Sequence, residues 1–315
     1  MFLEKHSRFF RKYEFTFAGR HKDSPALPLN HNDGEYSIRD ALQTLVNKEE
    51  ALEVLSNGDI LELMEVEYSQ AIDALTLLVH RASPDAAEPH YRKRARQAAG
   101  KKVSVRKVEK DADEHQSVSA HIVISGDKTG KGGYRAALEE IPGIHMAAIR
   151  RLVVKALHEY PYEFMRGKKT IETHSTFKPQ GVKSESMTNA LKTGRVNFVT
   201  LSRPAKPDWV DADGMFKPEQ EILRLRVEGS LDAENWRSKL FGLMKKAKDG
   251  GWADFKVDID LDDNRSRTVK LDRDEEAAEI LFVRAEQAFF ETELAACSVD
   301  IIEEVVRKAL AIAKS

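Results

Sequence analysis

The chain has 315 residues, 41% hydrophobic and 32% charged, a composition typical of a soluble globular protein with one large or two ordinary domains. Its formal net charge is −2, but residues 208–315 contain 17 Lys and Arg against 25 Asp and Glu, a net of −8, so residues 1–207 carry +6. The single cysteine, Cys297, excludes an intramolecular disulfide and a cysteine-based zinc cluster, and favours a reducing cytoplasm. No apolar run reaches the ~20 residues that span a bilayer, and the charge-interrupted start MFLEKHSRFFRKYEF is unlike a signal peptide.

The first eighty residues predict a small mixed sheet with one helix. Alternation of aromatic and polar residues indicates strands, Ser37 is a suitable helix cap, and Asn57-Gly58-Asp59 is typical of a hairpin turn. The expected elements are a strand over Arg11–Ala18, a helix over SIRDALQTLVN, a hairpin of Leu52–Leu55 with Ile60–Tyr68, and a strand over Ala74–His80.

Residues 90–110, HYRKRARQAAGKKVSVRKVEK, form the strongest charge signal, with nine Lys and Arg and one Glu. We expect a helix around Arg92–Arg96 and a strand around Val103–Val108. A net charge of +8 would repel itself without an anion nearby, which favours a polyanionic partner over a solvated basic face. Aromatic residues are scarce here, so contact with a duplex backbone is favoured over base stacking. The candidate binding residues are Arg92, Lys93, Arg94, Arg96, Lys101 and Lys102.

A loop rich in glycine and lysine follows a predicted buried strand at His121–Ile124. We expect a short helical segment after this loop and then a helix over Ile144–His158. Glycine allows close approach of backbone N–H groups and lysine adds charge, so the loop predicts a phosphate-binding site that includes Lys128, Lys131 and Arg135. The spacing is one residue too short for a nucleotide phosphate loop, and Gly132 stands where that motif has Ser or Thr.

The fold class predicted is α+β, with two mixed α/β domains and predominantly antiparallel sheets. The predicted domains are a basic one over 1–160, a basic, partly mobile connecting region over 161–207 and an acidic one over 208–315. The connecting region adds Lys168, Lys169 and Lys183 to the candidate binding residues. The other expected elements are strands over Arg195–Ser202 and Ile222–Glu228, a helix over Asp232–Lys248, a hairpin of Phe255–Leu261 with Ser266–Leu271, and a terminal helix over Thr292–Ala313.

A search for catalytic patterns finds one arrangement worth testing. Asp258, Asp260 and Asp262 alternate along a predicted strand and share a face with Lys256, which is compatible with a metal-dependent nuclease. An acidic solvent face of a hairpin is the favoured interpretation, and a calcium loop is excluded because Asp263 stands where glycine belongs. The histidines show no zinc-binding spacing, so no cofactor or metal is predicted.

Several segments resemble the RexA family of phage-exclusion proteins from lambdoid prophages. They are SIRDALQTLV, KKVSVRKVEKDADEHQSVSAHIVISGD, LKTGRVNFVTLSR and WRSKLFGLMKKAKDGG, with the terminal helix. The resemblance implies a cytoplasmic homodimer that binds duplex DNA without sequence preference. It also implies a sensor of phage DNA that signals to a small membrane partner, RexB, without inserting into the membrane itself, and a two-domain fold similar to the nucleoid protein RdgC.

The sequence therefore leads to the hypothesis of a non-enzymatic DNA-binding protein in phage exclusion, that is, abortive infection as an antiviral defence. In this hypothesis the basic side chains of the first half form one anion-binding surface, and affinity falls steeply with salt. Two alternatives are a metal-dependent nuclease that uses the three aspartates and an RNA-binding protein that uses the same basic surface.

Overall fold

The computed structural model describes residues 3–31, 36–94, 103–182, 196–204, 220–228, 236–252, 254–260, 266–270 and 283–315. The chain divides into two compact units: unit 1 comprises Met1–Gln180 with Glu286–Ser315, and unit 2 comprises Gly181–Ala285. Both units combine helices with antiparallel strands, which confirms the α+β prediction. The division differs from the predicted domain boundaries, because unit 1 extends past residue 160 and also includes the C-terminal segment Glu286–Ser315.

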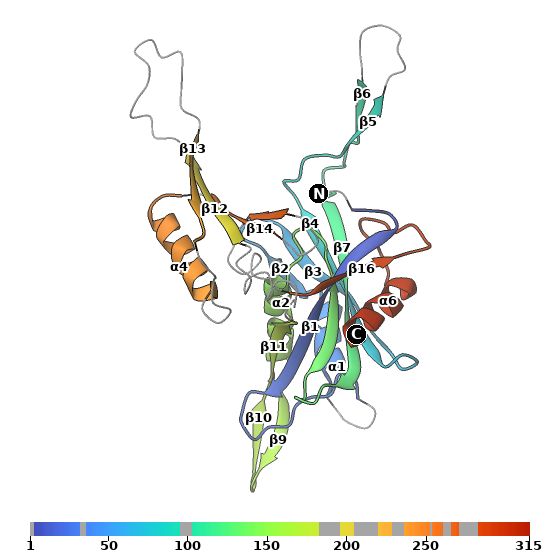
Figure 1. Ribbon diagram of the computed structural model, residues 1–315. Coiled ribbons are helices and arrows are strands. Elements are labelled where there is room, and N and C mark those ends of the chain that lie inside the picture. The colour runs from blue at the N-terminus through green and yellow to red at the C-terminus, as the bar shows by residue number, and fades with distance from the viewer. Residues whose placement is uncertain are drawn as a thin grey trace, which may run out of the picture. The chain divides into compact units, whose positions relative to one another are not determined.

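Unit 1 is built on an eight-stranded sheet with the order β11-β1-β8-β7-β4-β3-β2, in which β16 also pairs with β1 (Figure 1). Its strands are β1 (Ser7–Gly19), β2 (Leu52–Val54), β3 (Ile60–Ser69), β4 (Ala74–Ser83), β7 (Gln116–Lys128), β8 (Tyr134–Glu139), β11 (Ser175–Gly181) and β16 (Ala285–Phe289). Along the run β1-β8-β7-β4-β3-β2 of this sheet, each pair of neighbouring strands is antiparallel.

Helices cover the sheet of unit 1. On one face, α6 (Glu303–Lys314) packs on β1, β7 and β8, and its apolar residues join a core cluster with Phe10 and Val123. Elsewhere α1 (Ile38–Asn47) and α2 (Met146–His158) pack on each other and on β3. Side chains alternate along a strand, so a strand covered on both faces buries nearly every residue, as β7 does over most of its length.

Local signals at α1 and at the following turn place these elements where the sequence predicts them. The Ser37 hydroxyl accepts a hydrogen bond from the Asp40 amide at 3.1 Å, which caps the first turn of α1. The turn between β2 and β3 holds the buried side chain of Asp59, which accepts a hydrogen bond of 2.7 Å from Arg81 Nε. Arg81 also donates to the Pro142 carbonyl at 2.9 Å, so one guanidinium joins β4 to this turn and to the loop before α2.

The end of unit 1 differs from the predicted helix over Thr292–Ala313, because α6 begins only at Glu303. The preceding residues form an irregular segment that is bonded to the sheet instead of to itself. The Leu294 amide donates to the Lys5 carbonyl at 2.8 Å, and the Ile301 amide donates to Glu65 Oε2 at 3.0 Å. Cys297 therefore lies outside the helix, where it is half-buried. Tertiary hydrogen bonds have replaced helical ones here.

Unit 2 contains a four-stranded antiparallel sheet with the order β13-β12-β14-β15 and the helix α4 (Trp236–Asp249). The strands are β12 (Val196–Pro204), β13 (Gln220–Arg226), β14 (Asp254–Asp260) and β15 (Ser266–Lys270). The hairpin predicted for the last two is confirmed. Arg203 joins β12 to the end of α4, since it donates to the Gly250 carbonyl at 3.0 Å and lies 4.5 Å from the Trp252 ring centroid.

Candidate nucleic-acid interface

The most basic segment of the chain forms a two-stranded antiparallel ribbon, which we call the basic arm. It consists of β5 (His90–Arg94) and β6 (Val103–Lys107), and in the part of the chain that the structure describes it pairs with no other strand. Figure 1 shows the arm standing away from the eight-stranded sheet. Neither strand contains an acidic residue. The arm therefore presents main-chain and basic side-chain groups outside the core.

Both faces of the basic arm carry cations. Tyr91 pairs with Arg106, so these two side chains and Lys93 share one face, whereas Arg92 and Lys107 lie on the other. The Arg106 guanidinium lies 5.7 Å from the Tyr91 ring centroid, and Lys107 forms an ion pair with Glu88. All five side chains are exposed, Tyr91 to 60%. Exposed side chains gain no stability from the core, and an isolated hairpin is only marginally stable in water.

Of the six residues predicted in this segment, the arm contains three. Arg92 and Lys93 lie exposed in β5, and the backbone of Arg94 continues the strand. Arg96, Lys101 and Lys102 lie outside the described residues. The predicted helix over Arg92–Arg96 is wrong in its described part. Arginine and lysine favour helices only weakly, and pairing with the valine-rich β6 overrides that preference.

The loop predicted to bind phosphate is a hairpin turn between β7 and β8. The predicted helical segment after it is wrong, since Tyr134–Glu139 forms a strand. Within the turn the Thr129 amide donates to the Gly133 carbonyl at 2.7 Å, the Gly132 amide to the Thr129 carbonyl at 2.9 Å, and the Gly133 amide to the Thr129 hydroxyl at 3.2 Å. These three amides are used inside the turn and are not available to bind phosphate, so the phosphate site stays a prediction.

The basic residues around this turn have protein partners or lie singly on the surface. Arg135 donates to the Lys314 carbonyl at 3.1 Å, and the Lys314 ammonium pairs with Asp127 at 2.8 Å. The hydrogen bond and the charge of Lys314 hold the pKa of Asp127 below its ordinary value. Lys128 is exposed with its ammonium 5.7 Å from the Tyr134 ring centroid, and Lys131 is exposed at the tip. The turn belongs to the packing around the end of α6.

Among the described residues, the basic arm does not form the predicted single surface with Lys128, Lys131 and Arg135. The arm connects to the sheet where Ser83 of β4 pairs with Gln116, the first residue of β7. Lys128 is the last residue of the same strand. Thirteen residues of extended chain span about 40 Å. The two basic segments therefore lie at opposite ends of the sheet.

Lys168 and Lys169 lie at the tip of a second two-stranded hairpin, formed by β9 (Tyr162–Arg166) and β10 (Lys169–Thr173). No clear periodicity marks this segment, so these strands are missing from the prediction. Both lysines are exposed. Lys183 lies outside the described residues.

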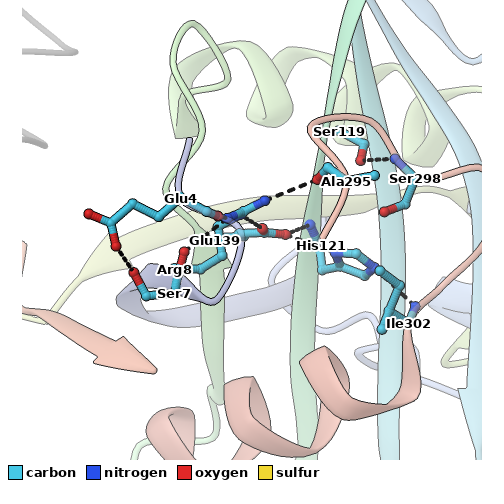
Figure 2. Close-up of polar contacts among 9 residues, drawn as sticks. All are labelled: Glu4, Ser7, Arg8, Ser119, His121, Glu139, Ala295, Ser298 and Ile302. Atoms are coloured by element: carbon cyan, nitrogen blue, oxygen red, sulfur yellow. Dashed lines mark hydrogen bonds and ion pairs between the residues drawn. The ribbon is translucent and has the colours of Figure 1, made fainter. Parts of the chain in front are cut away.

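A buried ionic cluster joins the sheet of unit 1 to the segment before α6, and Figure 2 shows it. Arg8 Nε donates to Glu139 Oε1 at 3.0 Å. Glu139 Oε2 lies 2.8 Å from His121 Nδ1 and accepts from the His121 amide at 3.0 Å. Arg8 also donates to the Ala295 carbonyl at 3.0 Å. The three side chains are at most 5% exposed.

This cluster resembles a catalytic carboxylate–histidine pair, but the His121 nitrogen that is not bonded to the carboxylate, Nε2, already has a hydrogen-bond partner in the protein. The Ile302 amide, at the start of α6, donates to His121 Nε2 at 3.1 Å. Nε2 therefore accepts, and Nδ1 carries the proton that Glu139 accepts. With both ring nitrogens bonded inside the protein, His121 fixes the start of α6 and has no nitrogen left to act as a base. Sequence reasoning placed His121 on a strand but missed its partners, because Glu139 reaches it through the register of β7 with β8 and Ile302 comes from the far end of the chain.

The nuclease alternative receives no support from the described residues. Asp258 and Asp260 lie two residues apart in β14 and pair with Thr268 and Ser266 of β15, and Asp262 lies outside the described part of the chain. Where side chains are described, no group of three or more His, Cys, Asp or Glu is placed to hold a metal ion. The nuclease therefore stays a prediction.

In the described ranges, no helix combines the length and apolar character needed to cross a membrane. No protein-family model, curated protein or solved structure matches this chain.

Proposed function

We propose that this protein binds duplex DNA without sequence preference and that the basic arm makes the principal contact. The observation that carries the proposal is a protruding two-stranded ribbon with exposed cations on both faces and no acidic residue in either strand. The major groove of B-form DNA is about 12 Å wide and admits a two-stranded ribbon. A ribbon in the groove has phosphates on both sides, which suits cations on both faces.

The arm has the chemistry of backbone contact more than that of base recognition. Lysine and arginine displace counterions from phosphates, a contribution that does not depend on sequence. Tyr91 is the one aromatic residue in the two strands, and Arg106 already lies against its ring. Proteins that bind single strands use several aromatic platforms. Duplex DNA is therefore the partner that fits the arm best.

The wider role rests on the resemblance to the RexA family. We propose on that basis a cytoplasmic, homodimeric and non-enzymatic sensor of phage exclusion that signals to a small membrane protein. The described structure contributes to this proposal only the arm and the filled hydrogen-bond positions of His121.

The test is a salt titration of binding to several unrelated duplexes. We expect similar affinities for all of them and a linear fall of log K with log salt. The triple variant Arg92→Gln, Lys93→Gln, Arg106→Gln should reduce that slope by about 2.7, at about 0.9 per phosphate contact. The control removes the same net charge from α4 of unit 2, through three exposed lysines: Lys245→Gln, Lys246→Gln, Lys248→Gln. It should keep the original slope.

Three results would overturn the proposal. They are affinity that does not change with salt, strong preference for one sequence, and an arm variant that binds as the original protein does. An RNA competitor that displaces duplex DNA at lower concentration would assign the arm to RNA instead. Nicking of plasmid in the presence of magnesium or manganese would revive the nuclease alternative.

A further inference from the structure

We infer that unit 1 has a second duplex-binding contact at the tip of the β9–β10 hairpin, so that one chain bridges two DNA segments. The inference rests on the proposed function of the basic arm. The occupant of this second site is a second segment of duplex DNA.

The tip of this hairpin concentrates positive charge. Arg166, Lys168 and Lys169 are exposed within four consecutive residues. Arg166 and Lys169 are opposite each other in the backbone register of the hairpin. Gly167, with φ of +66° and nothing within 4 Å of an added Cβ, completes a tight and open turn. The nearest acidic residues of the hairpin, the cross-strand pair Glu163 and Glu172, lie nearer its base. The charges are therefore separated along the hairpin, with the cations outermost.

Among the described residues, one acidic side chain reaches the tip, and the ion pair that it forms is weak. Arg166 lies 3.3 Å from Asp23, and both side chains are more than half exposed. Ion pairs of this kind contribute little, because solvent screens them and ordering two long side chains is unfavourable. A phosphate could displace Asp23 from Arg166 at small cost. Lys168 and Lys169 leave the local charge positive.

The base of the hairpin is anchored, so the tip is presented from a fixed position. Tyr162 and Phe164 of β9 are buried, and the Tyr162 hydroxyl donates to the Pro25 carbonyl at 2.6 Å. The Arg20 amide, directly after β1, donates to the His174 carbonyl at 2.9 Å, directly after β10. These contacts hold the hairpin at the Gly19 end of β1.

The basic arm leaves the sheet at the opposite end. In the register of the sheet, Phe10 of β1 pairs with Glu139 and Phe15 pairs with Tyr134. Tyr134 in turn pairs with Lys128 of β7. The Gly19 end of β1 and the Lys128 end of β7 therefore lie at the same end of the sheet. Figure 1 shows β5–β6 and β9–β10 projecting from opposite ends of unit 1. The strand length of about 40 Å between those ends exceeds one helical turn of DNA, which is about 34 Å.

A single duplex lying along the sheet to reach both ends would have to cross the layer that covers it. On the α6 side of that layer, Glu303 and Glu304 form ion pairs with Arg307 and Lys308, and Lys314 pairs with Asp127, so the cations of α6 already have acidic partners. A separate duplex at each end needs no contact with this helix. Two duplex segments are therefore the occupants that the positions of the two basic hairpins favour.

The test compares direct binding with bridging. A duplex is immobilised on beads, protein is added, and retention of a second, fluorescent duplex is measured beside the affinity for one short duplex in solution. The tip variant is Arg166→Gln, Lys168→Gln, Lys169→Gln. We expect it to keep the short-duplex affinity within about twofold and to lose about tenfold or more of the retained duplex, because three phosphate contacts are removed from one of two sites. The arm variant should lose both signals.

Each outcome decides between the proposals. Bridging by the tip variant at the original level would overturn the inference and would point to dimerisation through arm sites alone. Equal loss of direct binding and bridging would also overturn it, since the tip and the arm would then share one duplex. Original protein that binds but does not bridge refutes the inference alone, whereas protein that binds no duplex refutes the proposed function and the inference together. Thermal unfolding of the exposed tip variant should match that of the original protein.

Discussion

Replacing Glu139 by Gln would measure how far unit 1 depends on the buried ionic cluster of Figure 2. Glu139 accepts from Arg8 on one oxygen and from His121 on the other. The substitution keeps the shape of the side chain and removes its charge. The Arg8 side chain, 3% exposed, is then left without a carboxylate, and the new amide group presents hydrogens to a donor.

The expected loss is large for a conservative substitution. Removing one partner of a buried ion pair costs about 3–5 kcal/mol, because the remaining charge is neither paired nor hydrated. In a unit of about 200 residues, each kcal/mol lowers the Tm by about 2–4 °C. We therefore expect the Tm of unit 1 to fall by about 6–20 °C. The double variant Arg8→Met, Glu139→Gln should recover part of that loss, since no unpaired charge remains.

The assay can separate the two units. All three tryptophans, Trp209, Trp236 and Trp252, belong to unit 2, so tryptophan fluorescence follows that unit, while far-UV circular dichroism follows both. The substitution should lower the transition seen by circular dichroism and leave the tryptophan transition in place. Glu293→Gln is the matched control, because its partner Lys5 is 68% exposed and solvent already screens the pair. A shift below about 2 °C for Glu139→Gln would refute the reasoning that this cluster is desolvated.

Two further predictions concern residues at turns of unit 1, one for the packing around Gly126 and one for the pKa of Asp59. Gly126→Ala would place a methyl group 2.1–2.4 Å from the Asp73 carboxylate atoms, so we expect a loss of about 1–3 kcal/mol in urea unfolding, whereas Gly130→Ala, with nothing within 4 Å, should change little. Burial raises the pKa of Asp59, but hydrogen bonds and the charge of Arg81 outweigh it and leave that pKa below its ordinary value of 3.8. The resulting stabilisation is present above about pH 4 and is lost as the pH falls through the lowered pKa. In the Asp59→Asn variant, the free energy of unfolding should therefore depend less on pH below pH 4. The same pH dependence in both proteins would contradict this role of Asp59.

Much of unit 1 could be predicted from local patterns because its elements carry their own signals. The Ser37 cap and the Asn57-Gly58 turn each act within a few residues, and both are found as expected. The α+β class follows from such elements. The pairing of β9 with β10 could not be predicted, since polar and charged residues interrupt both strands and only the turn at Gly167 marks the hairpin.

The candidate site shows the limit of composition more sharply. Charge density identified the arm, because repulsion between neighbouring cations does not depend on their secondary structure. Charge density could not show that Lys128 and Gln116 lie at opposite ends of one strand. That separation follows from the length of β7, which is a property of the fold. The Arg8–Glu139–His121 cluster was missed for the opposite reason, because Arg8 is far from the other two in the chain and all three meet only through the register of the sheet.

The chain leaves unit 1 for unit 2 and returns to it through adjoining segments. Both β11 and β16 pair with β1, and just beyond them the Arg284 amide donates to the Val182 carbonyl at 2.8 Å. An insertion whose ends are neighbours adds no long connection to the host sheet, so loop closure costs unit 1 little. A short turn grafted between Val182 and Arg284 should accordingly leave a self-sufficient protein that keeps both basic hairpins, and the DNA contacts proposed for unit 1 could then be measured on it alone.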